Sequence, residues 1–109
     1  MRWYRDLYLG PNAAQNIQKI RKKAVSGTPM ASVYYITLAA ASQNLLDIFH
    51  NGMLTQSLFK DNQCLDIVGV AEGKQEAVRL TSTIIGEIYT KTGGVDVRKF
   101  FKEEDFEED

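Results

Sequence analysis

The chain has 109 residues, of which 44% are apolar and 25% charged, and this composition is typical of one ordinary globular domain with a single core. A chain of this length buries roughly 65% of the surface of its unfolded form, so it needs neither a metal nor a disulfide to fold. The single cysteine, Cys64, excludes an internal disulfide and a cluster of zinc thiolates. The chain has no apolar stretch long enough for a membrane span, and the charged N-terminus is unlike a secretory signal, so we expect a cytoplasmic protein.

The net charge of −1 combines two unlike parts. Residues 102–109 read KEEDFEED and hold six acids, which leaves 12 basic and 8 acidic residues, a charge of +4, in residues 1–101. We expect residues 1–101 to form one domain and residues 102–109 to be an acidic, disordered tail, because terminal blocks of like charge are usually solvated. The alternative is that the tail folds back on a basic surface and competes there with an anionic ligand.

A short strand and an amphipathic helix are the first predicted elements. Residues 3–9 alternate in polarity and are rich in aromatic side chains, which predicts a strand that ends at Gly10. Asn12 is placed to cap a helix over residues 13–26, and Gly27 supplies a left-handed end to it. The apolar residues of this helix recur at spacings of three and four: Ala13, Ile17, Ile20 and Ala24.

The rest of the chain predicts two buried strands, each followed by a helix. Residues 32–39 (SVYYITLA) and 64–71 (CLDIVGVA) are nearly continuous in apolar residues, as in strands covered on both faces. Between them the spacing of apolar residues favours a short helix over residues 45–51, capped by the preceding polar residues. A long helix is predicted over residues 74–92, and residues 95–101 form a further helical turn or a short edge element.

This order of elements, β-α-β-α-β-α, favours an α/β fold: a small sheet of two or three mostly parallel strands packed by helices. The alternative class is α+β, if the first strand does not form. Because small sheets expose their edges, we expect a homodimer or another homo-oligomer.

A candidate ligand site follows from the predicted parallel strands, since the loops after their carboxyl ends would share one edge of the sheet. The stretch GVAEGK is not a phosphate-binding P-loop, because its glycines are too close and Gln75 stands where a hydroxyl is needed. The polar residues could still hold a small anionic ligand near a helix N-terminus; the competing interpretation is that they only cap helices. The candidate residues are Asn12, Ser42, Gln43, Asn44, Glu72, Gly73 and Lys74.

No catalytic group, metal site or cofactor is predicted. His50 and Cys64 are the single histidine and cysteine and lie on different elements, and His50 with Asp47 gives two metal ligands without a third. Basic residues on the first helix could bind a polyanion, but four charges are few, so we do not expect nucleic-acid binding. These residues are Lys19, Arg21, Lys22 and Lys23; Arg98 and Lys99 form a second pair.

The phrases SVYYITLA with NLLDIF, then LDIVGVAEGKQEA, and IIGEIYTKTGGVDVRKFF resemble a group of small uncharacterised proteins from Clostridia-type gut bacteria. The resemblance covers residues 8–101 and departs from the group at Ala40, Ala41 and the acidic tail. It implies a bacterial, cytoplasmic protein with an α/β fold and supplies no catalytic residue. We therefore expect a non-catalytic interaction or regulatory module that self-associates. The alternatives are a domain that binds a small or phosphorylated ligand at the loop edge, and weak polyanion binding.

Overall fold

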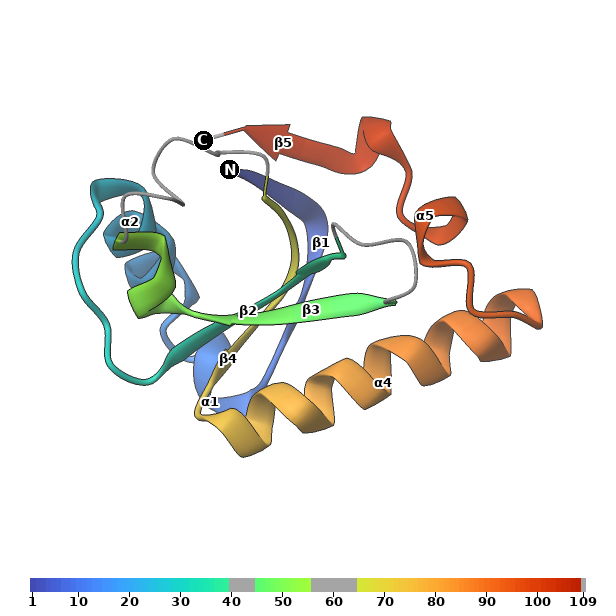
Figure 1. Cartoon of the computed structure of the whole chain (residues 1–109), viewed down its shortest axis with the longest axis horizontal. Helices are drawn as coiled ribbons and strands as arrows, with labels where there is room; N and C mark the ends of the chain where they lie inside the picture. The colour runs from blue at the N-terminus through green and yellow to red at the C-terminus, as the bar shows by residue number, and fades with distance from the viewer. Residues whose placement is uncertain (40–44, 56–64, 109) are drawn as a thin grey trace.

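A five-stranded mixed sheet forms the centre of the molecule in the computed structural model, which describes residues 1–39, 45–55 and 65–108 (Figure 1). The strand order is β3-β2-β4-β1-β5, and of the adjacent pairs β1 and β4 alone run parallel. The predicted α/β class is confirmed, but the sheet is larger than predicted and mostly antiparallel. The strands are β1 Arg2–Leu9, β2 Val33–Leu38, β3 Leu46–His50, β4 Asp66–Glu72 and β5 Phe106–Glu108.

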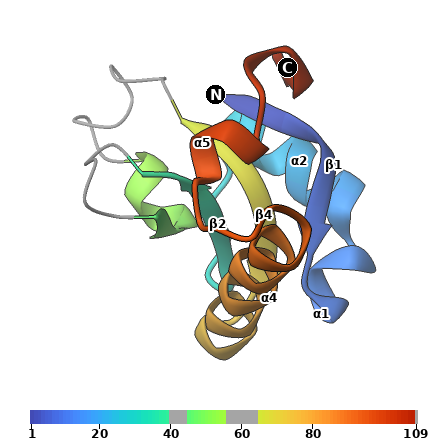
Figure 2. The same cartoon turned by 90° about the vertical axis from the view of Figure 1, so that its right-hand side faces the viewer.

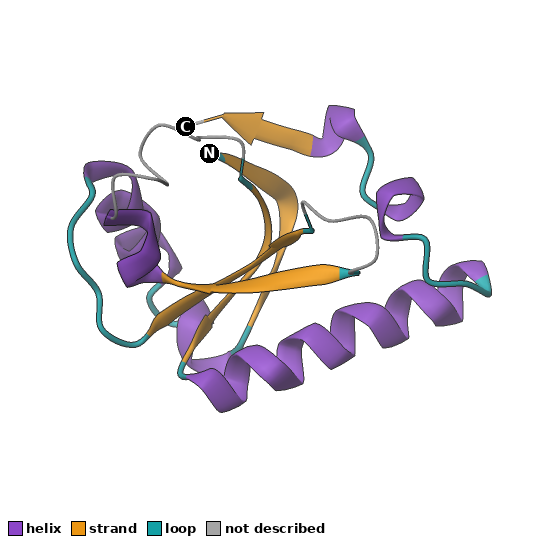
Figure 3. Ribbon diagram, viewed as in Figure 1, coloured by secondary structure: helices purple, strands orange, loops and turns teal. Residues whose placement is uncertain are grey.

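Helices cover both faces of this sheet, so the domain has three layers (Figures 2 and 3). The helix α2, Ile17–Ser26, packs on one face over Trp3, Tyr35 and Ile67. The helix α4, Lys74–Thr92, packs on the other face over Ile36 and Val68. Two short helices, α1 Pro11–Ala14 and α5 Val97–Phe100, and two 3-10 helices, η1 Asn51–Thr55 and η2 Glu103–Asp105, complete the described elements.

The predictions of strands over 3–9 and 32–39 and of a helix over 74–92 are confirmed by β1, β2 and α4. The predicted strand over 64–71 corresponds to β4, although Cys64 lies outside the described residues. α5 supplies the expected turn within residues 95–101. Long, strongly patterned segments were therefore predictable from the sequence.

The predicted helix over residues 45–51 is wrong, because residues 46–50 form β3, antiparallel to β2. Leu46 and Ile48 oppose Leu38 and Ile36 of β2, which belong to the α4 side of the core. The intervening Asp47 and Phe49 alternate to the opposite face. The segment therefore follows the period of two of a strand, although its apolar residues also fit a helical spacing.

The predicted helix over residues 13–26 is two helices, α1 and α2, with a break at Gln15 and Asn16. Asn12 does not cap it, since α1 begins at Pro11 with Gly10 at the cap position. The left-handed end at Gly27, with φ of 74°, is confirmed.

The C-terminal residues 103–108, which we expected to belong to a disordered tail over 102–109, form the turn η2 and the strand β5 in the structure. β5 pairs antiparallel with Arg2–Tyr4 of β1, after the turn η2. The physical reason is Phe106, the one apolar side chain among the acids, which is 9% exposed and joins the core under α4. In this arrangement the segment lies against β1 and its two arginines, as in the alternative in which the tail folds back on a basic surface.

The close approach of α4 to the sheet depends on Gly69 of β4. A Cβ atom there would lie 3.2–3.3 Å from side-chain atoms of Ile36, Leu80 and Ile84, tighter than most real contacts. The buried face of α4 is Ala77, Leu80, Ile84 and Ile88. Thr81 and Ile85, which flank this face, are only half-buried. No helix in the described part of the chain is long and apolar enough to cross a membrane.

Candidate functional site

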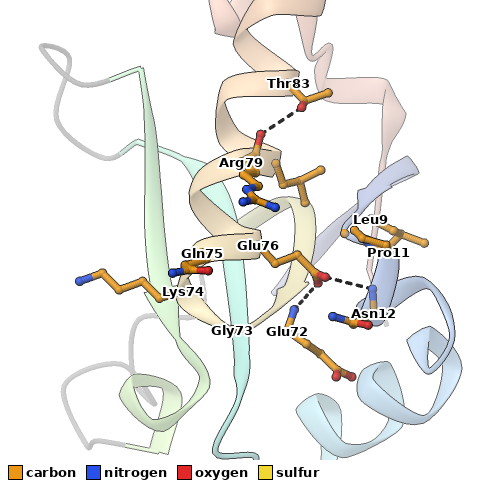
Figure 4. A pocket seen from close by; sticks show the side chains of 12 residues that line it. Leu9, Pro11, Asn12, Glu72, Gly73, Lys74, Gln75, Glu76, Arg79 and Thr83 are labelled. Atoms are coloured by element: carbon orange, nitrogen blue, oxygen red, sulfur yellow. Dashed lines mark hydrogen bonds between the residues drawn. The ribbon is translucent and has the colours of Figure 1, made fainter.

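A hollow of about 670 Å³ lies at the edge of the sheet where the parallel strands β1 and β4 end (Figure 4). The loops that follow the two strands form one wall, and the first turns of α4 form the other. Four of the predicted site residues, Asn12, Glu72, Gly73 and Lys74, line it, so the sequence correctly brought these two loops together. The other lining residues are Leu9, Gly10, Pro11, Gln75, Glu76, Arg79, Leu80 and Thr83.

The carboxylate of Glu76, in the first turn of α4, joins the two loops. It accepts hydrogen bonds from the backbone amides of Asn12 at 3.0 Å and Glu72 at 2.6 Å, and a longer one from Ala13 at 3.4 Å. Two of these amides belong to the start of α1, so Glu76 caps that helix from a distant part of the sequence. The sequence patterns missed this residue, because nothing in the spacing of residues 12 and 76 indicates that they meet.

Gly10 makes room for this carboxylate. A Cβ atom on Gly10 would lie 2.3 Å from the Cδ and Oε2 atoms of Glu76, a distance that real Cβ atoms do not show. A larger residue at this position would displace the Glu76 carboxylate from its hydrogen bonds. The Glu76 carboxylate thus forms a junction between the β1–α1 turn and the β4–α4 turn beside the hollow.

Some of the charged side chains around the hollow are bound within the chain, and others are not. Glu72 accepts a hydrogen bond from the Asn16 side chain at 3.3 Å, while Lys74 points away from Glu72 (Figure 4). The side chains of Lys74 and Arg79 have no hydrogen bond or ion pair with any residue that the structure describes. An anion would consequently find the amides of Asn12 and Glu72 occupied and two side-chain cations open.

Ser42, Gln43 and Asn44 lie outside the described residues. The argument that placed them in this site was that β2 runs parallel to β1 and β4. It runs antiparallel to β4 instead, with Val33 beside Glu72, so the carboxyl end of β2 lies at the opposite edge of the sheet. The geometric reason for including these three residues is therefore wrong.

His50 has a structural role at the end of β3. Its Nδ1 accepts from the amide of Gly52 at 3.0 Å, so its Nε2, 2.7 Å from the carbonyl oxygen of Ala31, donates as the N–H of a neutral ring. Cys64 lies outside the described residues. Within residues 1–39, 45–55 and 65–108 no three histidine, cysteine, aspartate or glutamate side chains gather around a metal position.

The basic residues of the sequence are divided among separate roles. Lys19 and Lys22 are exposed on α2, whereas the guanidinium of Arg21 lies 4.8 Å from the ring centroid of Trp3. Arg98 donates to the carbonyl oxygen of Ala39 at 2.5 Å. Part of the predicted basic set therefore stabilises the fold.

The outward side of α4, away from Glu76, has an unusual composition. Residues 80–86, about two turns of the helix, carry no charged side chain. Val78 is 49% exposed and Tyr89 62% exposed, and both share one side of the helix with Ser82 and the half-buried Ile85. We call these four residues the α4 stripe.

Comparisons with known proteins give no match: no family model, no curated protein and no solved structure is similar to this chain.

Proposed function

We propose that this domain is a non-catalytic interaction module that associates with a second copy of itself through the α4 stripe. The observation that carries the proposal is the uncharged, partly apolar outer side of α4. A helix on the surface of a globular protein normally places charged residues opposite its buried face. On α4 the span from Leu80 to Gly86 has none, which is typical of a helix covered on a second side.

A second copy fits this surface in an antiparallel arrangement. With a two-fold axis between Thr83 and Ile84, Val78 lies opposite the partner's Tyr89, and Ser82 lies opposite the partner's Ile85. The small side chains of Ser82 and Gly86 allow the two helices to approach closely. The pairing is isologous, so it closes as a dimer and does not extend into a filament.

The charge distribution along α4 suits the same arrangement. Lys74, at the start of the helix and unpaired in the described part of the chain, comes near the end of the partner's α4. That end carries the negative pole of the helix dipole, which a lysine stabilises. Two antiparallel copies therefore bring no like charges together at the centre of the interface. At each end, Lys74 of one copy lies near the negative end of the partner's helix.

The expected dimer is weak. Stable interfaces bury about 800 Å² on each partner, and a helix of 19 residues is about 28 Å long, so one helix pair supplies less than that area. We expect a dissociation constant on the order of 10 μM. Sedimentation equilibrium of the full chain between micromolar and millimolar concentration measures it.

The matched variants are Ser82→Arg and Thr90→Arg. Both place the same cation on an exposed position of α4, but only position 82 lies on the stripe. We expect Ser82→Arg to weaken the dimer at least tenfold and Thr90→Arg to leave it unchanged. A chain that stays monomeric at millimolar concentration contradicts the proposal, and equal effects of the two variants contradict the assigned surface.

Disulfide cross-linking tests the orientation in a Cys64→Ser background. An antiparallel pair predicts that a mixture of Val78→Cys and Tyr89→Cys chains cross-links. Neither variant alone should do so, because two copies of position 78 lie about 16 Å apart along the helix axis. Cross-linking of Val78→Cys alone would show a parallel pair.

A second candidate function is the binding of a small anionic ligand in the hollow at the ends of β1 and β4. It is favoured by Arg79, which lines the hollow and whose side chain has no partner among the described residues. A thermal-shift screen with inorganic phosphate, sugar phosphates and nucleotides tests it, with Arg79→Gln as the variant that should abolish a shift. Stabilisation that survives in Arg79→Gln would place the ligand elsewhere.

A further inference from the structure

The C-terminal residues 103–108, which we call the acidic segment, are held on β1 by two arginines. Arg2 donates to Glu103 at 2.5 and 3.2 Å, and Arg5 donates to Asp105 at 2.6 Å. The guanidinium of Arg2 keeps the pKa of Glu103 below its usual value through these hydrogen bonds. The contacts join residues about one hundred positions apart in the sequence.

Arg2 is oriented by a residue that does not belong to the acidic segment. Its Nε and Nη2 atoms donate to the Asp66 carboxylate of β4 at 2.7 and 3.0 Å. This bidentate pair fixes the plane of the guanidinium, so the group that receives Glu103 is in place before the segment arrives.

Phe106 packs against Tyr4 and Arg2 of β1. Its ring centroid lies 5.7 Å from that of Tyr4 and 5.3 Å from the guanidinium of Arg2. The ring of Tyr4 also contacts that of Phe101: the two centroids are 4.8 Å apart and the ring planes are nearly perpendicular. The acidic segment thus binds β1 through two of its own carboxylates and one aromatic ring.

The segment covers only part of the strand that holds it. β5 pairs with Arg2, Trp3 and Tyr4, whereas β1 continues to Leu9. Glu107 and Glu108 are exposed. In each ion pair one side chain is largely exposed, Glu103 at 81% and Arg5 at 58%, whereas Arg2 and Asp105 are 26% and 22% exposed. Exposed ion pairs contribute little stability and weaken with salt, so this is an element that can open locally.

We propose that the outer edge of β1 is a docking groove for an extended acidic strand with a phenylalanine, and that the acidic segment fills this groove within its own chain. The partner is a protein segment that adds to β1 as an antiparallel strand. Its carboxylates bind Arg2 and Arg5, and its aromatic ring replaces Phe106. Strand addition to a sheet edge takes affinity from backbone hydrogen bonds and specificity from such side-chain positions.

Competition by the chain's own segment sets the affinity for a partner. A tethered segment acts at an effective concentration in the millimolar range, so a free peptide with the same contacts cannot displace it at micromolar concentration. Loosening the acidic segment should therefore reveal the groove. This inference is independent of the dimer, which uses α4 on a different part of the fold.

The probe is a fluorescein-labelled peptide of residues 102–109, KEEDFEED, titrated into the 109-residue chain at low salt and followed by anisotropy. We expect Phe106→Ala, and independently Asp105→Lys, to bind this peptide at least tenfold more tightly than the unmodified chain. Adding Arg5→Glu to Phe106→Ala should remove the gain. A peptide with alanine in place of the phenylalanine should bind at least fivefold more weakly.

Hydrogen exchange on the same variants shows whether β5 has been released. If β5 loses protection and the peptide still does not bind at millimolar concentration, the groove serves only the chain's own segment and the proposal fails. Equal binding of the alanine peptide would also overturn it, because it would show charge attraction without strand recognition. Asp105→Lys keeps the test valid if Phe106→Ala does not fold.

Discussion

The two sides of α4 are used in opposite ways. On the side toward β1, Glu76 is bound by amides of both loops, and Glu87 accepts a hydrogen bond from the Tyr8 hydroxyl of β1. These acids are eleven residues apart, about three turns, so they lie on the same side of the helix. On the outward side the α4 stripe carries no charge and contacts no other element strongly enough to bury Val78 or Tyr89. One side therefore fixes the helix within the chain, and the other remains available to a second chain.

On the side of α4 that faces β1, we expect the largest loss of stability from Gly10→Ala. The added Cβ would lie 2.3 Å from the Glu76 carboxylate, so that group must move and release the amides at the start of α1. We expect a loss of about 3 kcal/mol in the free energy of unfolding, measured by urea denaturation. Gly94→Ala is the control, because a Cβ atom at that position would meet no atom within 4 Å and the φ of Gly94 is not positive. An equal loss in both variants would show that Gly10 has no special role.

Glu76→Gln tests the carboxylate itself. The amide keeps one oxygen for the Asn12, Ala13 and Glu72 amides, but its NH2 group cannot accept, so at least one of these donors loses its partner. We expect a loss of about 2 kcal/mol in the free energy of unfolding. Glu72→Gln, which alters a single contact to Asn16, should cost less than half as much. A Glu76→Gln chain as stable as the parent would contradict the junction.

The Glu87 contact predicts a small pH dependence. The hydrogen bond from Tyr8, together with Lys91 at 3.0 Å, lowers the pKa of Glu87 from its ordinary value of 4.5. Its contribution to stability is therefore present above that value and is lost as the pH falls through the lower, folded-state pKa. We expect less than about 1 kcal/mol, because the pair is partly exposed and screened.

Urea midpoints of the parent and Glu87→Gln between pH 3 and 7 measure this contribution. The difference between the two proteins should shrink toward zero at the acid end. Glu104→Gln, which changes an exposed acid without a partner among the described residues, should leave the profile unchanged. A difference that grows on acidification would reverse the sign and refute the assignment.

The same contrast explains what the sequence could predict. The helix α4 and the buried strands β2 and β4 follow from local patterns, and the gathering of Asn12 with Glu72 follows from the parallel pair β1 and β4. The contact of Glu76 with the start of α1 depends on tertiary packing, so no local spacing reveals it. β3 was predicted as a helix because five residues fit both periods, and only pairing with β2 decides between them.

The acidic segment shows the same principle through composition. A run of acids is usually solvated, but here the phenylalanine within the run belongs to the core, and two of the acids pair with Arg2 and Arg5. The signal was present in the sequence as the one apolar residue in KEEDFEED. The sequence did not show that the acids beside this phenylalanine would pair with Arg2 and Arg5, about a hundred residues away.

A substitution on the outward side of α4 should have the smallest effect on the folding of the monomer. It therefore differs most clearly from substitutions on the side that faces β1. Val78→Lys replaces a half-exposed, β-branched side chain on a helix with a better helix former, so the unfolding free energy of the monomer should change by less than about 0.5 kcal/mol. At concentrations where the parent dimerises, the same change should lower the apparent stability, because the dimer's contribution by mass action is lost. Urea denaturation at about 1 μM and at about 500 μM protein separates the stability of the monomer from the contribution of dimerisation. A loss that is the same at both concentrations would mean that Val78 supports the monomer, and that the second side of α4 is, like the first, part of the fold.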